Sequence, residues 1–496
     1  MALLFGTSNP QRSAEISREL KAGHLRKLAS KLYTDDLKSP AETIVQRNRL
    51  MIAAHFYPDA VISHRSALEG GSVSPGGKLH LSVPRKGVPP RKLPGLEIRI
   101  WNGPEPQAND IRTPLGDGLV VYSACEERAV LENFQIARAR ANDESKTFSG
   151  QELENWFDRQ QRLVGPDWLP QLEAKVQQLA NELGWQRELD CFKQFIAALR
   201  GKPSSHQLVS ELASSRARGK PYDPDRIALF AELHTRLASE PFPDLPAPPV
   251  AEHPNRAFWE AYFSNFIEGT KFSVEEAQEL VKETANAIHL EKKRPEDAHD
   301  VKETYRLIVD PNISGSVANN PDDYMNLIIR RHARMMATRH DVEPGVFKTK
   351  NNEVGSRTFV KPELVRETLA RGWLASRELK SAASRAFYIL FVVAEVHPFK
   401  DGNGRISRLG MNAVLENAQQ MRLIIPTSLR NDYISVLEAL TLNGNANPYV
   451  AFAHKLMDFN SRMPFRSFEE SYEHFKKTGA LDEPTNSNFS LENFIS

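Results

Sequence analysis

The sequence predicts a multidomain chain in which a mainly helical C-terminal bundle with a β-hairpin follows an α+β N-terminal region. Its 496 residues are enough for two or three domains, each with its own core. Short apolar runs separated by Gly and Pro clusters between about residues 60 and 122 are typical of strands. Apolar residues at helical spacing dominate after residue 147. The predicted parts are an N-terminal region (1–205), a helical segment with a proline-rich linker (206–255), a helical domain (256–460) and a C-terminal tail (461–496).

Residues 11–37 are predicted to form two short helices separated by Gly23, the second carrying Leu25, Leu28 and Leu32. Basic side chains outnumber acidic ones in this segment. A basic helix pair with an internal glycine is compatible with a helix-turn-helix on a phosphate backbone. A solvated basic face explains the same charges. Binding of DNA and a plain surface therefore both stay open.

Four strands are predicted further along the N-terminal region, at residues 61–63, 79–83, 96–101 and 119–122. The phrases at residues 23–33 and 61–68 resemble the AbiEi-type antitoxin and regulator proteins, and the similarity covers about residues 10–200. That resemblance brings no catalytic motif. It implies a winged helix joined to an α/β domain, with DNA as a partner and a link to toxin–antitoxin systems.

Helical spacing returns over residues 147–239 and is followed by a proline-rich stretch. Residues 241–254 hold six prolines, which favours an extended, semi-rigid boundary. A new run of helical spacing begins after it. We therefore expect the proline-rich stretch to separate the N-terminal region from the helical domain.

The densest group of reactive side chains is the loop 397–408, His-Pro-Phe-Lys-Asp-Gly-Asn-Gly-Arg-Ile-Ser-Arg. The apolar run 386–396 before it is too short to span a bilayer and is typical of a buried helix. Pro398 lacks an amide hydrogen and disfavours a helical residue before it, so this helix should end at about His397. Helical spacing resumes at Ile406. The glycines of the loop therefore fall at the N-terminus of a second helix.

That placement predicts an anion site. Glycines let the amides of residues 402–404 converge on an oxyanion, and the helix dipole adds to the attraction. Arg405 and Arg408 share one helix face and can hold two phosphates. Asp401 is a hard oxygen ligand for Mg²⁺, and His397 exchanges a proton near neutral pH. A solvated helix–helix turn explains any one of these residues, but the combination favours phosphate chemistry.

The loop matches the motif of the Fic family, His-Pro-Phe-x-(Asp/Glu)-Gly-Asn-Gly-Arg-x-x-Arg, at every defined position. The resemblance extends over about residues 255–455. Family members with an intact motif typically move AMP from ATP onto a hydroxyl side chain of a protein. The resemblance therefore implies a nucleotidyltransferase that uses ATP and Mg²⁺ and modifies Ser, Thr or Tyr of a protein target, including the chain itself.

The resemblance also implies a role for each residue of the loop. His397 would accept the proton of the attacking hydroxyl, and Asp401 would hold the metal. The nucleotide-binding residues implied are Gly402, Asn403, Gly404, Arg405 and Arg408. In that set the Asn403 side chain and the loop amides would face the transferred phosphate, Arg405 the β-phosphate region and Arg408 the γ-phosphate. Phe399 is expected to pack into the core and fix the loop.

A second short motif lies upstream, on a predicted helix that Gly269 closes and before a helix that Ser273 and Glu276 open with a capping box. Ser264, Glu268 and Gly269 match the inhibitory motif of the Fic family, (Ser/Thr)-x-x-x-Glu-(Gly/Asn). The pattern is short, and an ordinary helix end is the alternative. Its position before an intact Fic motif favours an inhibitory role for Ser264 and Glu268.

Residues 351–360 place turn residues around a short β-branched run, which predicts a hairpin. In Fic proteins a hairpin flap at this place lays the extended target segment beside the active site by strand addition. The target-flap residues that the resemblance implies are Val354, Gly355, Ser356, Arg357 and Thr358. An ordinary surface loop is the alternative.

Composition and charge give no overall bias toward nucleic acid or membranes, since 64 basic and 63 acidic residues leave a net charge of +1. Cys125 and Cys191 lack metal-ligand spacing and are too few for a disulfide framework, which favours a reducing compartment. The first five residues do not resemble a signal peptide, and no apolar run reaches membrane length. A cytoplasmic protein is expected, and a homodimer stays open.

Two alternatives to AMP transfer stay open. The first is another phosphate transfer, such as phosphorylation, UMP transfer or phosphocholine transfer. The Doc kinases of the family alter the Gly-Asn-Gly-Arg part of the motif, which is intact here. The second is a DNA-bound regulator or antitoxin whose Fic half only senses nucleotide, although an intact His397 argues against a dead enzyme.

Overall fold

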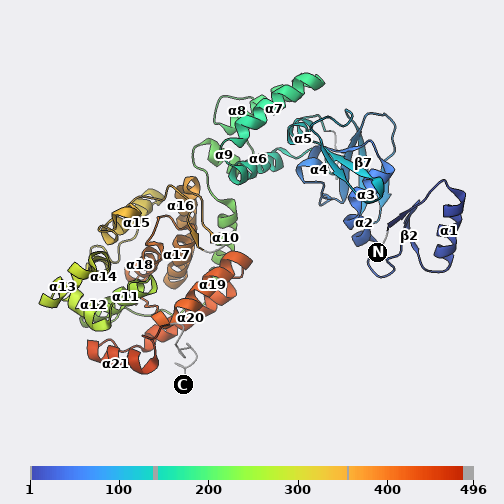
Figure 1. The fold of residues 1–496 in the computed structure, drawn as a ribbon. Helices are drawn as coiled ribbons and strands as arrows, with labels where there is room; N and C mark the ends of the chain where they lie inside the picture. The colour runs from blue at the N-terminus through green and yellow to red at the C-terminus, as the bar shows by residue number, and fades with distance from the viewer. Residues whose placement is uncertain (1–2, 138–142, 355–356, 484–496) are drawn as a thin grey trace. The chain divides into compact units, whose positions relative to one another are not determined.

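The computed structural model describes residues 3–137, 143–354 and 357–483, and the chain divides into two compact units, residues 1–218 and 219–496 (Figure 1). The first unit is α+β and the second is almost wholly helical, as the sequence predicts. The division lies after Arg218 because helix α10 (Pro224–Ala238) buries Phe230, Leu233 and Leu237 in the core of the second unit. The helical segment before the prolines thus belongs to the C-terminal unit.

Two sheets organise the N-terminal unit over its described residues. A small antiparallel sheet has the order β1-β3-β2, and a larger mixed sheet has the order β6-β7-β5-β4-β9-β8 with parallel pairs β5–β7 and β4–β9. The strands are β1 (Leu3–Phe5), β2 (Arg26–Ala29), β3 (Leu32–Thr34), β4 (Val61–Ile62), β5 (Lys78–Val83), β6 (Arg91–Leu93), β7 (Leu96–Asn102), β8 (Ile111–Pro114) and β9 (Val120–Ser123). The four strands predicted from the sequence correspond to β4, β5, β7 and β9.

The N-terminal unit also contains helices, some of which pack on the sheets while others form a separate helical part. They are α1 (Pro10–Lys21), α2 (Ala41–Arg47), α3 (Arg49–Phe56), α4 (His64–Leu68), the 3-10 helix η1 (Gly116–Gly118), α5 (Glu126–Asn133), α6 (Gly150–Val164), α7 (Trp168–Leu183), α8 (Gln186–Leu199) and α9 (Glu211–Ala217). Helices α5 to α8 share a core of their own, built around Phe157, Phe192 and Phe195. The helical pattern predicted from residue 147 is therefore confirmed.

The second short helix predicted within residues 11–37 is wrong, because that segment forms the hairpin β2–β3. Lys31 turns the chain with a positive φ of 59°, and Leu28 and Leu32 enter a core shared with the larger sheet. Helix α1 is capped by the side chain of Asn9. The helix-turn-helix interpretation thus loses its second helix, and the DNA-binding prediction loses the basic helix pair as a support.

Helices α17 (Ala382–Val396) and α18 (Asn403–Asn417) lie side by side at the centre of the C-terminal unit (Figure 1). Their burial explains the apolar run read from the sequence. The surrounding elements are η2 (Val250–Glu252), α11 (His253–Ile267), α12 (Val274–Val281), α13 (Ala285–Lys293), α14 (Pro295–Val309), α15 (Pro321–Met335), η3 (His340–Val342), β10 (Glu353–Val354), β11 (Arg357–Thr358), η4 (Pro362–Leu364), α16 (Val365–Ser376), η5 (Thr427–Leu429), α19 (Arg430–Asn443), α20 (Asn447–Arg462) and α21 (Phe468–Thr478).

The proline-rich stretch lies within the C-terminal unit rather than between the two units. Pro246 forms a β-bridge with Gln420, and the N–H of Ala247 donates to the carbonyl of Gln419 at 3.0 Å. Phe242 stacks on His454 with ring centroids 4.5 Å apart. Prolines keep this stretch extended, which lets it lie along the helices as a strap.

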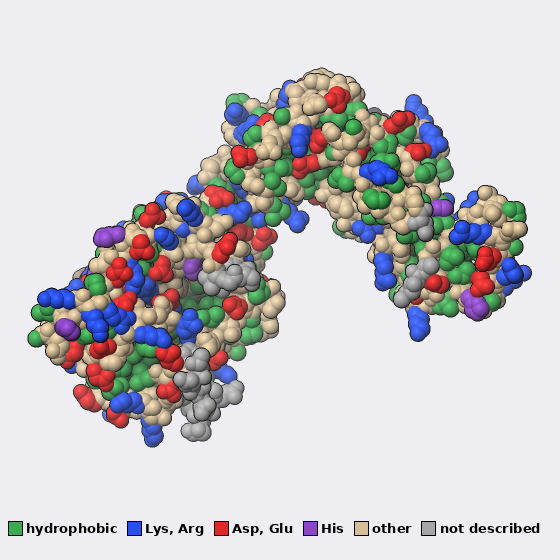
Figure 2. All heavy atoms as spheres, in the orientation of Figure 1, with side chains coloured by type: hydrophobic (Ala, Val, Ile, Leu, Met, Phe, Trp, Pro, Cys, Tyr) green, Lys and Arg blue, Asp and Glu red, His purple; other side chains and the backbone are tan. Residues whose placement is uncertain are grey.

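The C-terminal segment docks on helix α11 through aromatic side chains. Phe468 of α21 stacks on Trp259, with ring centroids 5.4 Å apart and planes 8° apart. The segment predicted as a C-terminal tail thus begins with a docked helix, and residues from 484 onward lie outside the described residues. In the described part of the chain, no helix combines the length and apolar character that crossing a membrane requires. Figure 2 shows Lys and Arg mixed with Asp and Glu over both units on the visible face.

Candidate active site

His397 caps the C-terminus of α17 in the left-handed conformation, with φ 52° and ψ 61°. Pro398 disfavours the helical conformation at this position. The imidazole Nδ1 lies 3.3 Å from the carbonyl oxygen of Ala394, and the ring stacks on Phe359 with centroids 3.9 Å apart. Because a carbonyl only accepts, this contact places the hydrogen on Nδ1. In the neutral ring the lone pair is then on Nε2, as a general base requires.

The loop after His397 is closed by the side chain of Asn403. Its Oδ1 accepts from the N–H of Phe399 and its Nδ2 donates to the carbonyl of Phe399, both at 2.8 Å. Both polar groups of this side chain hold the loop, and one Nδ2 hydrogen is left over, so the expectation that the side chain also faces a phosphate stays a prediction. The main-chain N–H of Asn403 still belongs to the open first turn of α18. Phe399 is fully buried, as predicted.

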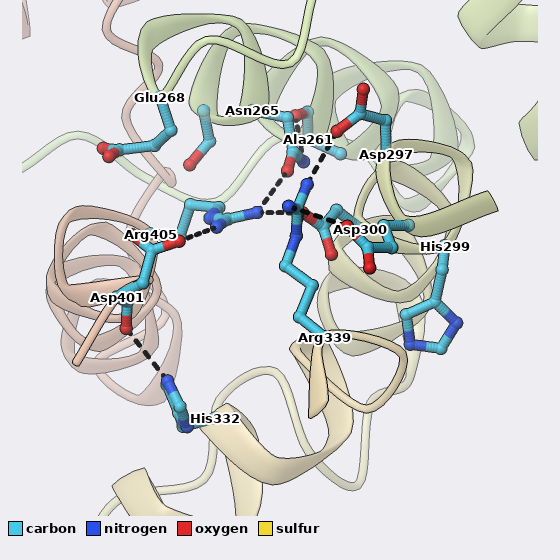
Figure 3. Close-up of polar contacts among 12 residues, drawn as sticks. Ala261, Asn265, Glu268, Asp297, His299, Asp300, His332, Arg339, Asp401 and Arg405 are labelled. Carbon is cyan, nitrogen blue, oxygen red and sulfur yellow. Dashed lines mark hydrogen bonds and ion pairs between the residues drawn. The ribbon is translucent and has the colours of Figure 1, made fainter. Parts of the chain in front are cut away.

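His332 on α15 supports the same loop and was not identified from the sequence. Its ring stacks on Phe399 with centroids 3.8 Å apart and planes 4° apart. Nδ1 accepts from the N–H of Gly345 at 2.9 Å, so Nε2 carries the hydrogen that it donates to the Asp401 carbonyl at 3.0 Å (Figure 3). Burial lowers the pKa of His332 to about 4. The neutral His332 ring thus holds the loop in place.

The glycines on either side of Asn403 have different reasons: Gly402 needs its backbone conformation, and Gly404 lies beneath the Glu268 carboxylate. Gly402 adopts a φ of 75°, and a Cβ there would lie 3.1 Å from the sulfur of Met336. A Cβ at Gly404 would lie 2.2 Å from Oε1 of Glu268. The backbone amides at the start of α18 lack partners in the preceding turn, as at any helix N-terminus. Their dipoles and the absence of a Cβ make this turn an anion site.

Arg405 extends from that turn into a buried network of polar groups (Figure 3). Its Nη1 donates to Oδ2 of Asp300 on α14 at 2.6 Å and to Oδ1 of Asn265 on α11 at 3.3 Å. Arg339 donates to the same Asp300 oxygen at 2.8 Å. Nη2 of Arg405 lies 3.8 Å from Oδ2 of Asp401, whose side chain is about half exposed. Asp300 is fully buried, so it fixes the direction of the Arg405 guanidinium.

Arg408, one turn further along α18, is held by the segment that carries the predicted inhibitory motif. Its Nε donates to the hydroxyl of Ser264 at 3.0 Å and its Nη2 to the Ser264 carbonyl at 2.9 Å. Nη2 also pairs with Oε1 of Glu268 at 2.7 Å. Helix α11 and its C-cap residue therefore contact both loop arginines, through Asn265 on Arg405 and through Ser264 and Glu268 on Arg408.

A hairpin is present where the sequence predicts one. Strand β10 pairs antiparallel with β11, with Val354 opposite Arg357 in the register. Gly355 and Ser356 lie outside the described residues. The carbonyl of Thr358 accepts from Nη2 of Arg226 at 2.9 Å, which fixes the end of β11 to helix α10. The role of this hairpin as a target flap stays a prediction.

The chain on either side of the hairpin is bonded to the motif loop. Asn352 Nδ2 donates to the carbonyl of Phe399 at 2.9 Å, and the N–H of Lys348 donates to the carbonyl of Pro398 at 2.9 Å. Phe359, just after β11, is the ring that stacks on His397. Burial lowers the pKa of the Lys348 ammonium to about 8. These contacts place the hairpin next to the predicted base.

The structure thus brings together residues that the sequence singled out from three separate segments. Ser264 and Glu268 meet Arg408, and the loop residues share one helix N-terminus. Sequence reasoning missed the side chains that position this group, namely Asn265, Asp300, His332, Arg339 and Phe359. Asn265 had a usable signal, since it follows Ser264 within the inhibitory motif. Asp300 and His332 lie on polar helices and Arg339 lies between α15 and η3, and none of these segments gives a local sign of a site.

The comparisons with known proteins agree with the geometry. A model of the Fic/DOC family matches residues 324–415. The protein adenylyltransferase fic-1 of Caenorhabditis briggsae is 33% identical over 132 residues, which cover 26% of this chain and 26% of that protein. The protein adenylyltransferase Fic of Nematostella vectensis is 26% identical over 265 residues, 51% of this chain and 59% of that protein.

The chain therefore spans between about a quarter and three fifths of the length of these curated relatives. Among solved structures, Fic-1 from Caenorhabditis elegans aligns at 19% identity and a TM-score of 0.37, over 62% of this chain and 88% of that one. The matched segment 324–415 holds His397, Asp401, Arg405 and Arg408. The C-terminal unit of this chain therefore contains a Fic/DOC family domain.

Proposed function

We propose that this chain is a protein adenylyltransferase that moves AMP from ATP to a protein hydroxyl and is held back by Glu268. The observation that carries the proposal is the convergence of a histidine, a half-exposed carboxylate, the open first turn of α18 and two buried arginines on one loop. Relatives named protein adenylyltransferase support the choice of AMP. The intact Gly-Asn-Gly-Arg part of the motif supports it over phosphorylation.

In the proposed reaction a Ser, Thr or Tyr hydroxyl loses its proton to Nε2 of His397 as its oxygen bonds to the α-phosphorus of ATP. The bond between that phosphorus and the bridging oxygen breaks, and pyrophosphate leaves. The Nδ1 hydrogen bond to the Ala394 carbonyl supports the positive charge that the ring gains. A positioned base of this kind contributes on the order of 10²–10⁴-fold to a rate.

The first turn of α18 would stabilise the oxygens of the transferred phosphate, because its amides and the helix dipole are fixed before ATP arrives. Arg405, whose direction is set by Asp300, would bind the β-phosphate region. Asp401 fits a magnesium ion, because it offers one accessible carboxylate beside the anion site, and nucleotide-bound Mg²⁺ takes one or two carboxylates plus phosphate oxygens. That ion offsets the charge of the phosphates when it is bound.

Glu268 supports an inhibited state through the contact that it makes with Arg408. The carboxylate lies where a γ-phosphate partner of that arginine would lie, and it covers Gly404 at the helix N-terminus. A negative carboxylate and a negative phosphate cannot share one guanidinium without repulsion. ATP would then bind with its α-phosphate shifted from the line of attack, and a misplacement of about 1 Å can cost roughly 100-fold.

Intact-mass spectrometry tests this proposal on the full chain. Wild type, Glu268→Gly and Glu268→Gly/His397→Ala are incubated with ATP and Mg²⁺, alone and with candidate target proteins. We expect a mass gain of one AMP group on the chain or on a target with Glu268→Gly, little with wild type and none with the double variant. A gain of one phosphate group in place of AMP would contradict the proposed reaction.

A further inference from the structure

A cavity of about 70 Å³ lies in the C-terminal unit away from the motif loop. Helices α15, α16, α17 and α18 and the loop before α15 form its walls. Ile389 and Gly410 mark its position, two turns before His397 on α17 and just beyond Arg408 on α18. A single buried water needs roughly 10–15 Å³ by a comparable measure, so the cavity has room for a compact anion but not for a nucleoside triphosphate.

The charged side chains that line the cavity are all positive. Arg331, Arg377 and Arg385 line it, and none of its lining residues is Asp or Glu. Arg331 is 5% exposed, and its Nη2 donates to the carbonyls of Ile313 and Ser316, each at 2.9 Å. Among the described residues, no carboxylate lies within ion-pair distance of these three arginines. Carbonyl dipoles and the more distant Glu416 only partly compensate the buried Arg331 guanidinium, so the wall keeps a net positive charge.

Polar and aromatic groups complete the wall. The hydroxyl of Tyr324, which is 5% exposed, has no hydrogen-bond partner in the described part of the chain. Its ring stacks on Trp373 with centroids 6.0 Å apart, and the Arg377 guanidinium lies 5.7 Å from the Trp373 ring. A buried hydroxyl without a partner is unfavourable unless a ligand supplies one. The cavity thus offers cations, one free hydroxyl donor and a flat apolar surface.

We propose that this cavity binds a small organic oxyanion, with the charged group held by Arg331, Arg377 and Arg385 and by the Tyr324 hydroxyl. The flat apolar part of the ligand lies against Trp373. The site is distinct from the nucleotide site, yet it uses the same helices. Arg331 lines the cavity, whereas His332, the next residue, holds the Asp401 carbonyl of the motif loop.

Titration calorimetry of the full chain with benzoate, and separately with inorganic phosphate, tests the site at an ionic strength held constant with chloride. We expect saturable binding to wild type. The double variant Arg377→Gln/Arg385→Gln should weaken it by about tenfold or more, because it removes two charge-assisted contacts. Tyr324→Phe should weaken it a few-fold while leaving the fold intact. Arg331 is not varied, because its guanidinium also holds the loop before α15.

Arg330→Gln is the matched control, since it removes the same charge from an exposed neighbour on α15 that does not line the cavity. We expect its affinity to stay within about twofold of wild type, because exposed charges contribute little. Tighter binding of benzoate than of phosphate would support a ligand with a flat apolar part. Absence of saturable binding of both probes would overturn the proposal. Binding that Arg408→Gln removes and the cavity variants leave intact would place the anion at the motif loop and overturn it as well. The readout is binding, so an inactive enzyme would not affect it.

Discussion

Replacing Glu268 with glycine should raise AMP transfer and lower stability at the same time. Loss of an ordinary structural contact has a different effect, because it lowers both the rate of AMP transfer and the stability. Oε1 of Glu268 lies 2.7 Å from Nη2 of Arg408, which is 4% exposed, and the carboxylate also lies over Gly404. The change therefore frees a buried guanidinium and uncovers the first turn of α18. Glu268 follows the last residue of α11, so glycine there leaves the helix itself largely unchanged.

The size of the effect follows from this one contact. A charge-assisted hydrogen bond contributes about 1.5–3 kcal/mol, and the partial exposure of Glu268 favours the lower end. A tenfold change in an equilibrium corresponds to about 1.4 kcal/mol. Release of the contact should therefore favour the productive ATP pose by about tenfold, and up to roughly 100-fold if the shifted pose is misplaced by about 1 Å. The free energy of unfolding should fall by about 1–2 kcal/mol.

The assay is the initial rate of AMP incorporation at saturating ATP, with urea unfolding measured on the same preparations. Glu268→Gln is the matched control, because it removes the charge but keeps the side chain over Gly404. We expect its rate to fall between wild type and Glu268→Gly. If Glu268→Gly transferred AMP no faster than wild type, with both proteins folded and saturated, the inhibitory role of Glu268 would be refuted.

Three further predictions follow from the geometry of the loop. His397→Ala should reduce transfer on the order of 10²–10⁴-fold and leave ATP binding by calorimetry largely unchanged, since the base does not hold phosphate; an unchanged rate would remove it as the base. Asp300→Asn leaves the buried Arg405 without its close carboxylate, whereas Arg339 keeps Asp297, and the change should cost about 3 kcal/mol in urea unfolding; a loss below about 1 kcal/mol would show that Asp300 does not hold Arg405. The pKa of His332 is lowered from 6.5 to about 4, so the unfolded chain binds the proton first, and stability should fall by roughly 3 kcal/mol as pH drops from 6.5 to 4. His332→Gln should flatten that slope, and an equal slope in both proteins would contradict the assignment.

Local chemistry made the motif loop predictable from the sequence. Pro398 ends one helix, Gly402 begins the next with a positive φ, and the side chains between them follow from their positions. Glu268 was also singled out from the sequence, and it pairs with Arg408 although these residues are 140 positions apart. Both residues were found because each belongs to a short motif of the Fic family, the inhibitory motif for Glu268 and the loop motif for Arg408.

Side chains that act through long-range packing could not be predicted in the same way. Asp300 lies on a polar helix and Arg339 on the connection between α15 and η3, and neither segment gives a sign of which carboxylate will be buried. Asn403 was expected to face a phosphate, but nothing in the sequence indicated that its amide also bonds the backbone of Phe399 and so holds the loop. The segment around Leu28 and Leu32 fits helical spacing and strand alternation, and packing on the sheet selects the strand.

The central claim is that His397 catalyses transfer of the α-phosphoryl group of ATP with its nucleoside. The most direct test incubates Glu268→Gly with protein extract, Mg²⁺ and either α-labelled or γ-labelled ATP, with Glu268→Gly/His397→Ala as the blank. We predict that protein acquires label from α-labelled ATP only and that the double variant acquires none. Label from γ-labelled ATP, or α-label that persists without His397, would contradict the claim.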